Sequence, residues 1–252
     1  MRFPLFTACI LGVCATATVS PPANAHDGAH AGGISSAPAK ATSAPFDLVH
    51  TRIRTEGNVA VFHIAVSGNA GASRPAKSGK LAGSRVFSYV WPTTLDPATV
   101  GFEAASGILA FAVTAHPDFD DTPLFDENGD GDAANDGDLW HSHWVVLTPD
   151  DACGKGALKV VDIPEGSKPR LPKTWPGLPL LIDSPGWQPR FARDTLEVRV
   201  PFDDIGAVRA ARYDGVAAAL RVNASVHSPL LCVSDVFKVA SGDLSLPGVV
   251  SE

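Results

Sequence analysis

The sequence contains little sulfur, and this scarcity excludes several kinds of metal site. Met1 is the single methionine, so a methionine-rich site for cuprous ions is excluded. The four cysteines form a pair near the N-terminus, Cys9 and Cys14, and a distant pair, Cys153 and Cys232. The motifs C-x-x-C, G-x-S-x-G, G-x-x-x-x-G-K-[ST] and H-E-x-x-H do not occur. The signatures of redox dithiols, serine hydrolases, phosphate-binding loops and zinc proteases are therefore missing.

Basic clusters and long apolar segments are also scarce. The chain has 20 Lys and Arg against 27 Asp and Glu, a formal net charge of −7. An acidic chain without a basic cluster does not attract nucleic acid or anionic membranes. Beyond the N-terminal region no stretch approaches the roughly 20 apolar residues that span a bilayer. We expect no nucleic-acid partner and no membrane span.

Residues 1–25 have the features of a secretory signal peptide. Arg2 supplies the positive charge, a short apolar run follows it, and Ala23-Asn24-Ala25 is a cleavage site of the A-x-A type. Cleavage there would leave His26 as the first residue. Without Arg2 the balance becomes 19 basic against 27 acidic residues, or −8. We predict a periplasmic or secreted protein.

Cleavage would also remove Cys9 and Cys14 and leave only Cys153 and Cys232. Two cysteines that remain in an exported chain usually pair, because the compartment is oxidising. We therefore predict one disulfide between them. The alternative, a thiolate metal site, requires Cys or His neighbours at closer spacing.

The rest of the chain is interpreted as a flexible tail followed by one β-rich domain. Residues 26–45 consist largely of Gly, Ala, Ser and Pro, which is typical of a flexible segment. Residues 46–252 contain short runs rich in Val, Ile and Phe between turn residues, without strand–helix–strand alternation. This pattern predicts an all-β fold, an antiparallel sandwich or barrel.

Individual elements follow from the same pattern. Strands are expected at 47–54, 59–67, 85–90, 108–116, 139–147, 158–163, 195–201, 216–226 and 231–239. Residues 164–189 are rich in proline and are expected to cross the surface without regular structure. A short helix is expected within 201–211, with Asp203 or Asp204 as its N-cap.

An acidic stretch after residue 125 has the ligand spacing of a calcium loop. Carboxylate and amide side chains alternate around Gly131, whose flexibility permits a sharp turn. The spacing resembles the calcium loops of EF-hands, dockerins and thrombospondin-type repeats, although Gly137 stands where an EF-hand has a bidentate Glu. A solvated acidic turn is the alternative. The expected ligands of a structural calcium ion are Asp126, Asn128, Asp130, Asp132 and one of Asp136 or Asp138.

Histidines supply ligands of a second kind, suited to zinc or copper. His141 and His143 are two residues apart on an expected strand, so they project from one face together with Val145 and Leu147. The run His-Ser-His-Trp resembles the zinc-ligand strand of α-type carbonic anhydrases, but no other part of the chain continues that pattern. Local candidates for either ion are His116, Asp118 and Asp120.

A hairpin adds another histidine pair. If the strands at 47–54 and 59–67 pair around a Glu56-Gly57 tip, His50 lies directly opposite His63, with Cβ atoms about 5 Å apart. The alternative leaves His50 exposed beside Arg52 and Arg54. The predicted transition-metal site consists of His50, His63, His141 and His143.

The mature N-terminus could capture further ions through His26 and His30. A free α-amine and the adjacent imidazole can chelate copper, which resembles the histidine brace of lytic polysaccharide oxygenases. A brace requires a rigidly held first residue, whereas this tail is expected to be flexible. We therefore expect metal capture by a mobile tail.

Together these patterns predict an exported metal-binding protein that delivers, buffers or senses zinc or copper, with calcium as a separate structural ion. Its partners would be metal ions and an envelope transporter or a metalloprotein recipient. A metal-dependent enzyme and a calcium-stabilised adhesion module are the alternatives. An enzyme should place an aromatic pocket beside the histidines, and an adhesion module should leave the histidines scattered. We favour a binding protein; the sequence identifies no catalytic residue.

Overall fold

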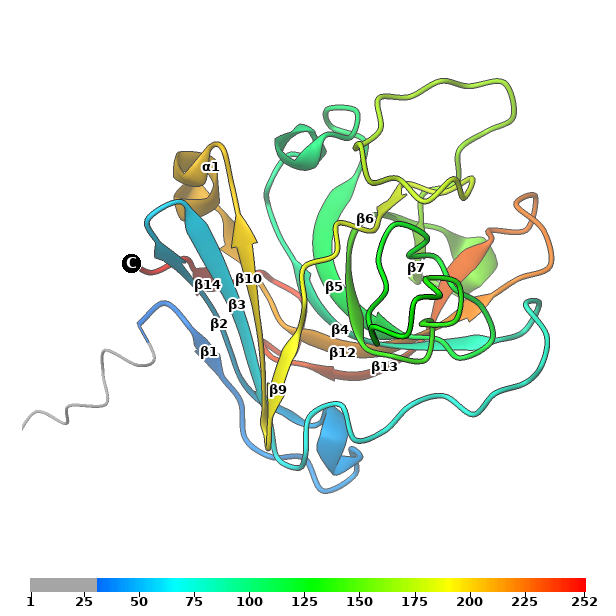
Figure 1. Cartoon of the computed structure of the whole chain (residues 1–252). Helices are drawn as coiled ribbons and strands as arrows, with labels where there is room; N and C mark the ends of the chain where they lie inside the picture. Colours follow the sequence, from blue (N-terminus) through cyan, green and yellow to red (C-terminus); the bar gives the residue numbers. More distant parts are fainter. Residues whose placement is uncertain (1–30) are drawn as a thin grey trace, which may run out of the picture.

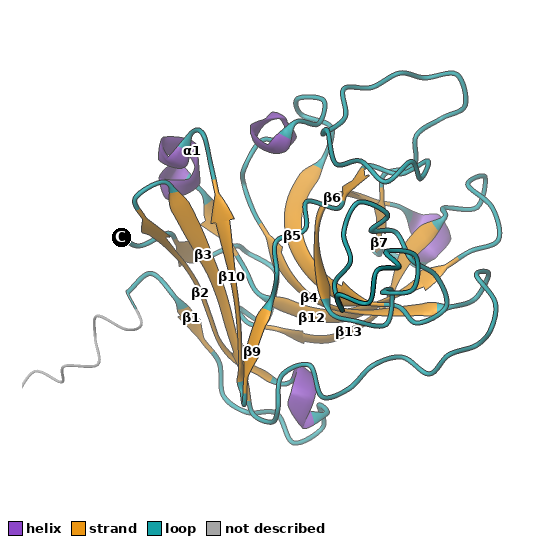
Figure 2. Cartoon of the chain, viewed as in Figure 1, coloured by secondary structure: helices purple, strands orange, loops and turns teal. Residues whose placement is uncertain are grey.

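The computed structural model describes residues 31–252 and has an all-β architecture, as predicted. The predicted signal peptide, His26 and His30 lie outside the described residues. A closed barrel and a separate antiparallel sheet lie face to face (Figures 1 and 2). Within the described range, α1 (Ile205–Ala210) is the one α-helix. None of the helices there has the length and apolar character that crossing a membrane requires.

Six antiparallel strands close the barrel. In spatial order around the ring they are β4 (Arg85–Pro92), β5 (Ile108–Ala115), β6 (His141–Pro149), β7 (Leu158–Val160), β13 (Leu231–Val239) and β12 (Val216–Val222), which returns to β4. A short strand, β8 (Ile182–Asp183), also pairs with β6. Pairing of β5 with β6 closes the ring, so the barrel buries the backbone edges that an open sheet would expose.

The separate sheet has five strands. In order they are β1 (Ile34–Ser35), β2 (Leu48–Glu56), β3 (Val59–Val66), β10 (Thr195–Pro201) and β9 (Arg190–Ala192). A small two-stranded sheet joins β11 (Arg212–Tyr213) to β14 (Gly248–Val249). The remaining short elements are the 3-10 helices η2 (Ala44–Phe46), η3 (Pro97–Val100) and η4 (Asp151–Cys153).

Strand periodicity divides the apolar residues between two cores. One core fills the space between the five-stranded sheet and the outer wall of the barrel, where Phe62 of β3 contacts Trp91, Phe111 and Trp144. The second core lies inside the barrel and is aliphatic. Because side chains alternate along β6, Trp144 faces the first core and Val145 faces the second. The predicted face of the His-x-His strand is confirmed.

The predicted hairpin register is wrong by two residues. Arg52, not His50, lies opposite His63, and His50 pairs with Ala65. The turn consists of Gly57 and Asn58, and the positive φ of Gly57 (63°) fits the left-handed backbone of a two-residue hairpin turn. A register shift of two residues leaves every side chain on the face of the sheet predicted for it. His50 and His63 therefore still lie on the same face, with ring centroids 5.7 Å apart.

Two segments expected to be irregular contribute strands. In the expected tail, β1 pairs with β2, and the Asp47 carboxylate accepts hydrogen bonds from the Ala39 backbone N–H. The proline-rich connection contains β8, and its Leu180–Ile182 portion is buried in the two cores. Part of this connection is therefore buried rather than exposed, because its apolar side chains pack into the cores.

Two local predictions are confirmed. The Asp204 side chain accepts a hydrogen bond from Ala207 N–H at the start of α1. Cys153 of η4 and Cys232 of β13 form a disulfide. The disulfide is consistent with an extracytoplasmic location, because thiols are kept reduced in most cytosols.

Candidate metal centre

Four buried side chains converge at one end of the barrel interior. They are His116, Asp121, His141 and His143, and one ligand atom from each lies within 4.8 Å of all the others. The exposed fraction is 1% for each histidine and 5% for Asp121. A buried carboxylate beside three buried imidazoles is costly unless a proton or a cation compensates it.

The two neighbouring strands β5 and β6 position the histidines. His141 and His143 project into the barrel from β6, where they pair across the strands with Thr114 and Ala112 of β5. His116 follows the end of β5, two residues after Thr114, and therefore projects to the same side as its inward-facing residues. The cluster thus depends on β5–β6 pairing, which brings together His116 and His141 although they are 25 residues apart in the sequence.

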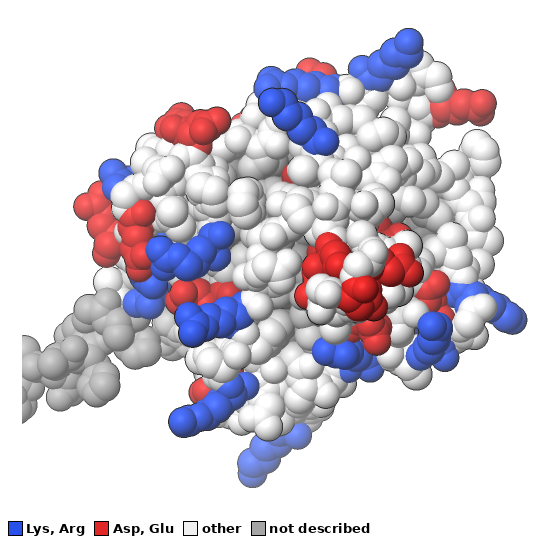
Figure 3. All heavy atoms as spheres, in the orientation of Figure 1, with Lys and Arg blue, Asp and Glu red and all other residues white. Residues whose placement is uncertain are grey.

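The loop that follows β5 brings Asp121 to the histidines. His116 N–H donates to the carbonyl of Gly137 at 2.6 Å. The Asp120 carboxylate accepts from Asp136 N–H at 2.9 Å and from Thr122 N–H at 2.8 Å. These bonds tie both ends of the 116–137 segment together next to the barrel, where it is seen in green in Figure 1. The same segment carries the acidic patch at the front of Figure 3.

The interatomic distances match a single coordination sphere. Asp121 Oδ1 lies 3.1 Å from His116 Nε2, 3.3 Å from His141 Nε2 and 3.5 Å from His143 Nε2. The Nε2 atoms of His116 and His141 are 2.9 Å apart. A tetrahedral zinc ion with ligands at 2.0–2.1 Å separates those ligands by about 3.3 Å. These four distances are therefore close to the separation of ligands around one small ion.

Backbone carbonyls orient the three imidazoles. His116 Nδ1 lies 2.8 Å from Phe119 O, His141 Nδ1 lies 2.8 Å from Leu139 O, and His143 Nδ1 lies 3.2 Å from Asp183 O. A carbonyl oxygen can only accept, so each Nδ1 carries the proton and each neutral ring presents an Nε2 lone pair to the centre.

Four acceptors consequently face one another. His143 Nε2 and Asp121 Oδ1 have no well-aligned hydrogen-bond donor despite being buried. The Thr114 hydroxyl lies 3.4 Å from His141 Nε2, and the Ser184 hydroxyl, which donates to Asp121 O, lies 3.2 Å from His143 Nδ1. A cation satisfies such an arrangement, because it binds all four lone pairs at once.

Burial and mutual charge set the ionisation of the cluster. Burial lowers the pKa of His143 to about 3, although the nearby Asp121 carboxylate opposes this shift. Burial would raise the pKa of Asp121, but His143 and His116 outweigh burial and hold that pKa well below its ordinary value. Burial would lower the pKa of His116, but Asp121 outweighs burial and raises it. A proton on His116 therefore compensates the ionised Asp121 when no metal is bound, and a metal ion would displace that proton, because ligation requires a neutral imidazole.

His50 and His63 do not join this cluster, contrary to the predicted four-histidine site. They lie on β2 and β3 of the five-stranded sheet, whereas His141 and His143 lie inside the barrel. The strand face of each pair was predicted correctly. Two separate sheets cannot bring both pairs to one ion, because the aromatic core lies between them.

The predicted calcium ligands lie in the acidic loop but outside the His–Asp cluster. Asp126 accepts hydrogen bonds from Gly129 N–H and Gly131 N–H, and Asp130 accepts from Asp132 N–H. Other loop contacts involve Asn128, Asn135 and Asp132. Asp136 is fully buried, with Oδ2 bound to Glu127 N–H and Oδ1 without a partner. Asp138 is exposed.

Asp121 is the ligand that sequence reasoning missed. It adjoins Asp120, which was a candidate, but Asp120 instead bonds the backbone of the loop. Asp118, another candidate, accepts from Ser78 N–H and Gly79 N–H. The run His116–Asp121 signals a local ligand set, but nothing in it distinguishes the one carboxylate that turns inward.

No protein-family model matches this chain, and no curated protein or solved structure matches it either. The chemistry of the site is therefore inferred from its geometry.

Proposed function

We propose that this chain is an exported metal-binding protein with one resident zinc ion bound by His116, His141, His143 and Asp121. The observation that carries the proposal is the convergence of four buried acceptor atoms whose histidine tautomers are set by backbone carbonyls. Three imidazoles and one carboxylate at near-tetrahedral spacing suit zinc. Export is supported by the predicted signal peptide and by the disulfide.

Copper is the second candidate ion. Copper(I) favours thiolate and thioether ligands, yet Cys153 and Cys232 are disulfide-bonded and Met1 is the single methionine. Copper(II) favours square-planar or tetragonal arrangements. The spacing of the four atoms therefore favours zinc over either copper state.

A resident ion fits the site better than an ion held for delivery. Every ligand is at most 5% exposed, and the acidic loop is bonded beside the barrel end. Release would require this loop to open. Sensing or ligand binding with a retained ion thus has more support than delivery to a transporter or recipient, or buffering.

The enzyme alternative has less support. A catalytic zinc typically has three protein ligands and an open position for water, whereas four protein groups converge here. The cavity beside the histidines is mainly aliphatic, although Phe119, which stacks on His116, also lines it. An adhesion module is disfavoured because three of the histidines are gathered into one cluster.

Calcium remains part of the proposal as a second, structural ion. Its support is the fully buried Asp136, whose Oδ1 has no partner, beside Glu127. Burial, together with the charge of Asp136 and opposed by the Thr122 hydrogen bond, raises the pKa of Glu127 to about 7. A divalent cation would compensate this pair of carboxyl groups.

Metal analysis of protein purified from the envelope, followed by zinc titration of chelator-treated protein, tests the zinc proposal. We expect one zinc ion per chain, and its loss in a His141→Gln/His143→Gln variant. His227→Gln is the matched control, because His227 is an exposed histidine outside the cluster. One zinc ion that persists in the double variant, or a wild-type protein that binds no zinc, would refute the proposal.

A further inference from the structure

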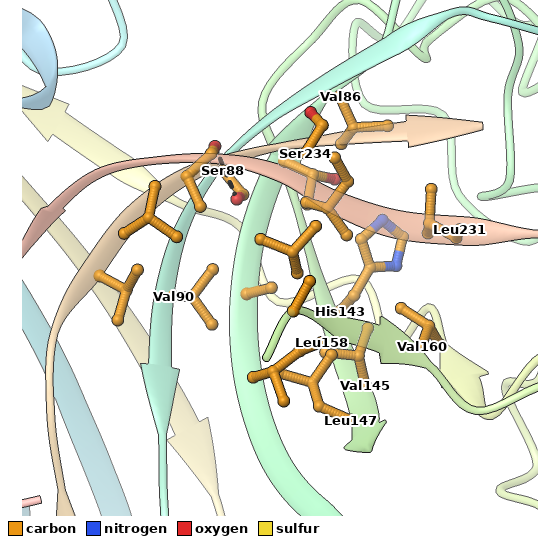
Figure 4. A pocket seen from close by; sticks show the side chains of 18 of the residues that line it. Val86, Ser88, Val90, His143, Val145, Leu147, Leu158, Val160, Leu231 and Ser234 are labelled. Atoms are coloured by element: carbon orange, nitrogen blue, oxygen red, sulfur yellow. Dashed lines mark hydrogen bonds between the residues drawn. The ribbon is translucent and has the colours of Figure 1, made fainter. Parts of the chain in front are cut away.

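The barrel interior contains a cavity of about 510 Å³ that ends at the metal centre. Ligand pockets typically have volumes of about 300–1,000 Å³, so this cavity can hold a small molecule. His116, Asp121 and His143 form part of its wall. Figure 4 shows the His143 ring among the aliphatic side chains that line the cavity.

The cavity exists because small side chains occupy inward positions on several strands. Ser88, Ala112 and Ala218 line it on β4, β5 and β12, where larger residues would fill the barrel. Valine and leucine side chains supply most of the remaining wall. Protein cores contain few voids larger than a water molecule, and an apolar void of this size indicates space for a ligand.

Polar groups are distributed unevenly along the wall. The Ser88 hydroxyl already donates to Ala218 O at 3.0 Å, and the Ser234 hydroxyl donates to Ala219 O at 3.2 Å. The polar atoms that remain available inside therefore concentrate at the metal end, where Thr114 adjoins the cluster. A ligand would place its polar group there and its apolar part along the barrel.

Apolar side chains also line the route to solvent. Leu81 and Val236 line the cavity and are 54% and 56% exposed, and both belong to the small set of exposed large apolar residues. Large apolar side chains are more often buried than exposed. Two that are exposed and also line the cavity would give a hydrocarbon chain an apolar entrance.

Charge at the metal end selects the head group. A zinc ion contributes +2, the Asp121 carboxylate contributes −1, and the three histidines are neutral as ligands, so the occupied centre would carry about +1. An anionic head group that lies beside the centre neutralises this charge while the four protein ligands stay in place. The other charged lining residues, Asp235 and Asp243, are exposed carboxylates, and Asp235 pairs with Arg85, so neither offers a second site for an anion.

We propose that the cavity binds an amphipathic anion with a single hydrocarbon chain, an alkyl carboxylate, with its carboxylate at the metal centre. This inference rests on the proposed zinc site. The chain lies against the valine and leucine wall, and the head group lies beside His143 and Thr114.

Calorimetric titration of zinc-loaded protein with hexanoate, octanoate and decanoate tests the proposal. Each added methylene should raise affinity about threefold to fourfold, the equivalent of burying one CH₂ group. Decanol, which lacks the charge, should bind at least about tenfold more weakly than decanoate. Removal of zinc should abolish the preference for decanoate over decanol.

Variants locate the ligand. Ala218→Val and Ala218→Leu should reduce decanoate affinity in graded steps while one zinc ion per chain is retained, which also shows that the fold persists. Ala104→Leu makes the same change at an exposed position away from the cavity and should have no effect. In cobalt-substituted wild-type protein, decanoate should alter the visible absorption of the metal, a measurement that requires no variant.

The two proposals fail differently. Protein that binds zinc but none of the carboxylates overturns the cavity proposal and leaves the zinc site in place. Wild-type decanoate affinity in a zinc-loaded Ala218→Leu protein would place the ligand elsewhere and also overturn it. Absence of zinc binding would refute the metal centre and, with it, the assigned head-group position.

Discussion

At the scale of single residues, His63 links stability to pH without belonging to the candidate metal centre. It is half-buried on β3, close to His50 and opposite Arg52. Burial, together with the positive charges of Arg52 and Arg54, lowers the pKa of His63 to about 4. In the unfolded chain its pKa would be about 6.5. Between these values the unfolded chain binds more protons than the folded one.

We predict that His63 makes the protein less stable as pH falls from about 6.5 towards 4, and that its full contribution to stability is present above pH 6.5. The shift corresponds to at most about 3 kcal/mol, and partial solvent exposure reduces this value. In His63→Gln, the free energy of unfolding should therefore fall less between pH 7 and pH 4.5 than in the wild type.

Urea denaturation in the presence of a chelator measures both proteins without a contribution from bound metal. His227→Gln serves as the control, because its exposed side chain should leave the wild-type pH dependence unchanged. Parallel pH profiles for the wild type and His63→Gln would contradict the prediction.

At the scale of elements, the loop after β5 supports the cluster of His116, Asp121, His141 and His143. A Cβ atom on Gly137 would lie 1.8 Å from Phe119 O and 2.8 Å from His116 O. These two oxygens belong to the backbone, so a change of side-chain rotamer cannot relieve the clash. The 116–119 segment itself would have to move. That movement would shift His116 and, through the chain, Asp121.

We predict that Gly137→Ala costs about 2–3 kcal/mol of stability and weakens zinc binding, because overpacking displaces two ligands. Zinc titration and chemical denaturation measure the two effects. Gly129→Ala is the control in the same loop: its φ of 74° strains an alanine, but no atom lies within 4 Å of the added Cβ. It should retain wild-type zinc affinity. Wild-type affinity in Gly137→Ala as well would show that the loop does not position the ligands.

The disulfide is a second support at this scale. Cys153 of η4 and Cys232 of β13 are separated by 79 residues, so the bond constrains a long loop of the unfolded chain. We predict that Cys153→Ala/Cys232→Ala lowers the free energy of unfolding by roughly 4 kcal/mol. Guanidinium denaturation measures this loss, and reduced wild-type protein should match the variant. An unchanged midpoint in both samples would contradict the expected stabilisation.

At the scale of the whole molecule, two cations should stabilise the fold independently. We predict that zinc, added to chelator-treated protein at a hundredfold excess over Kd, raises the free energy of unfolding by about 2.7 kcal/mol, because it binds only the folded state. Calcium should add a separate increment through the acidic loop. Thermal denaturation with each ion alone and with both measures the increments.

Matched variants separate the two effects. His141→Gln/His143→Gln should lose the zinc increment and retain the calcium increment, whereas Asp130→Asn/Asp136→Asn should do the reverse. A melting temperature that calcium leaves unchanged in metal-free wild-type protein would remove calcium from the proposed function without affecting zinc.

Local patterns in the sequence were sufficient for the class of the fold and for much of its detail. The alternation of apolar residues predicted the principal strands, because the period of two is a property of each strand alone. The same period placed His141 and His143 on the inner face of β6. Cys153 and Cys232 were predicted as partners because they are the cysteines that remain after the predicted signal peptide. Asp204 was predicted as a helix cap because a cap bonds a backbone N–H only a few residues further along the chain.

The composition of the site was decided only by the tertiary structure. Closure of the barrel through β5–β6 pairing brought His116 to His141. Asp118 and Asp120 accept backbone hydrogen bonds from Ser78 and Asp136 instead, which leaves Asp121 as the carboxylate of the cluster. Closure also determined that His50 and His63 belong to a different sheet and that an apolar cavity adjoins the metal centre. Strand periodicity determines which way a side chain points, but non-local pairing and loop closure determine what it meets there.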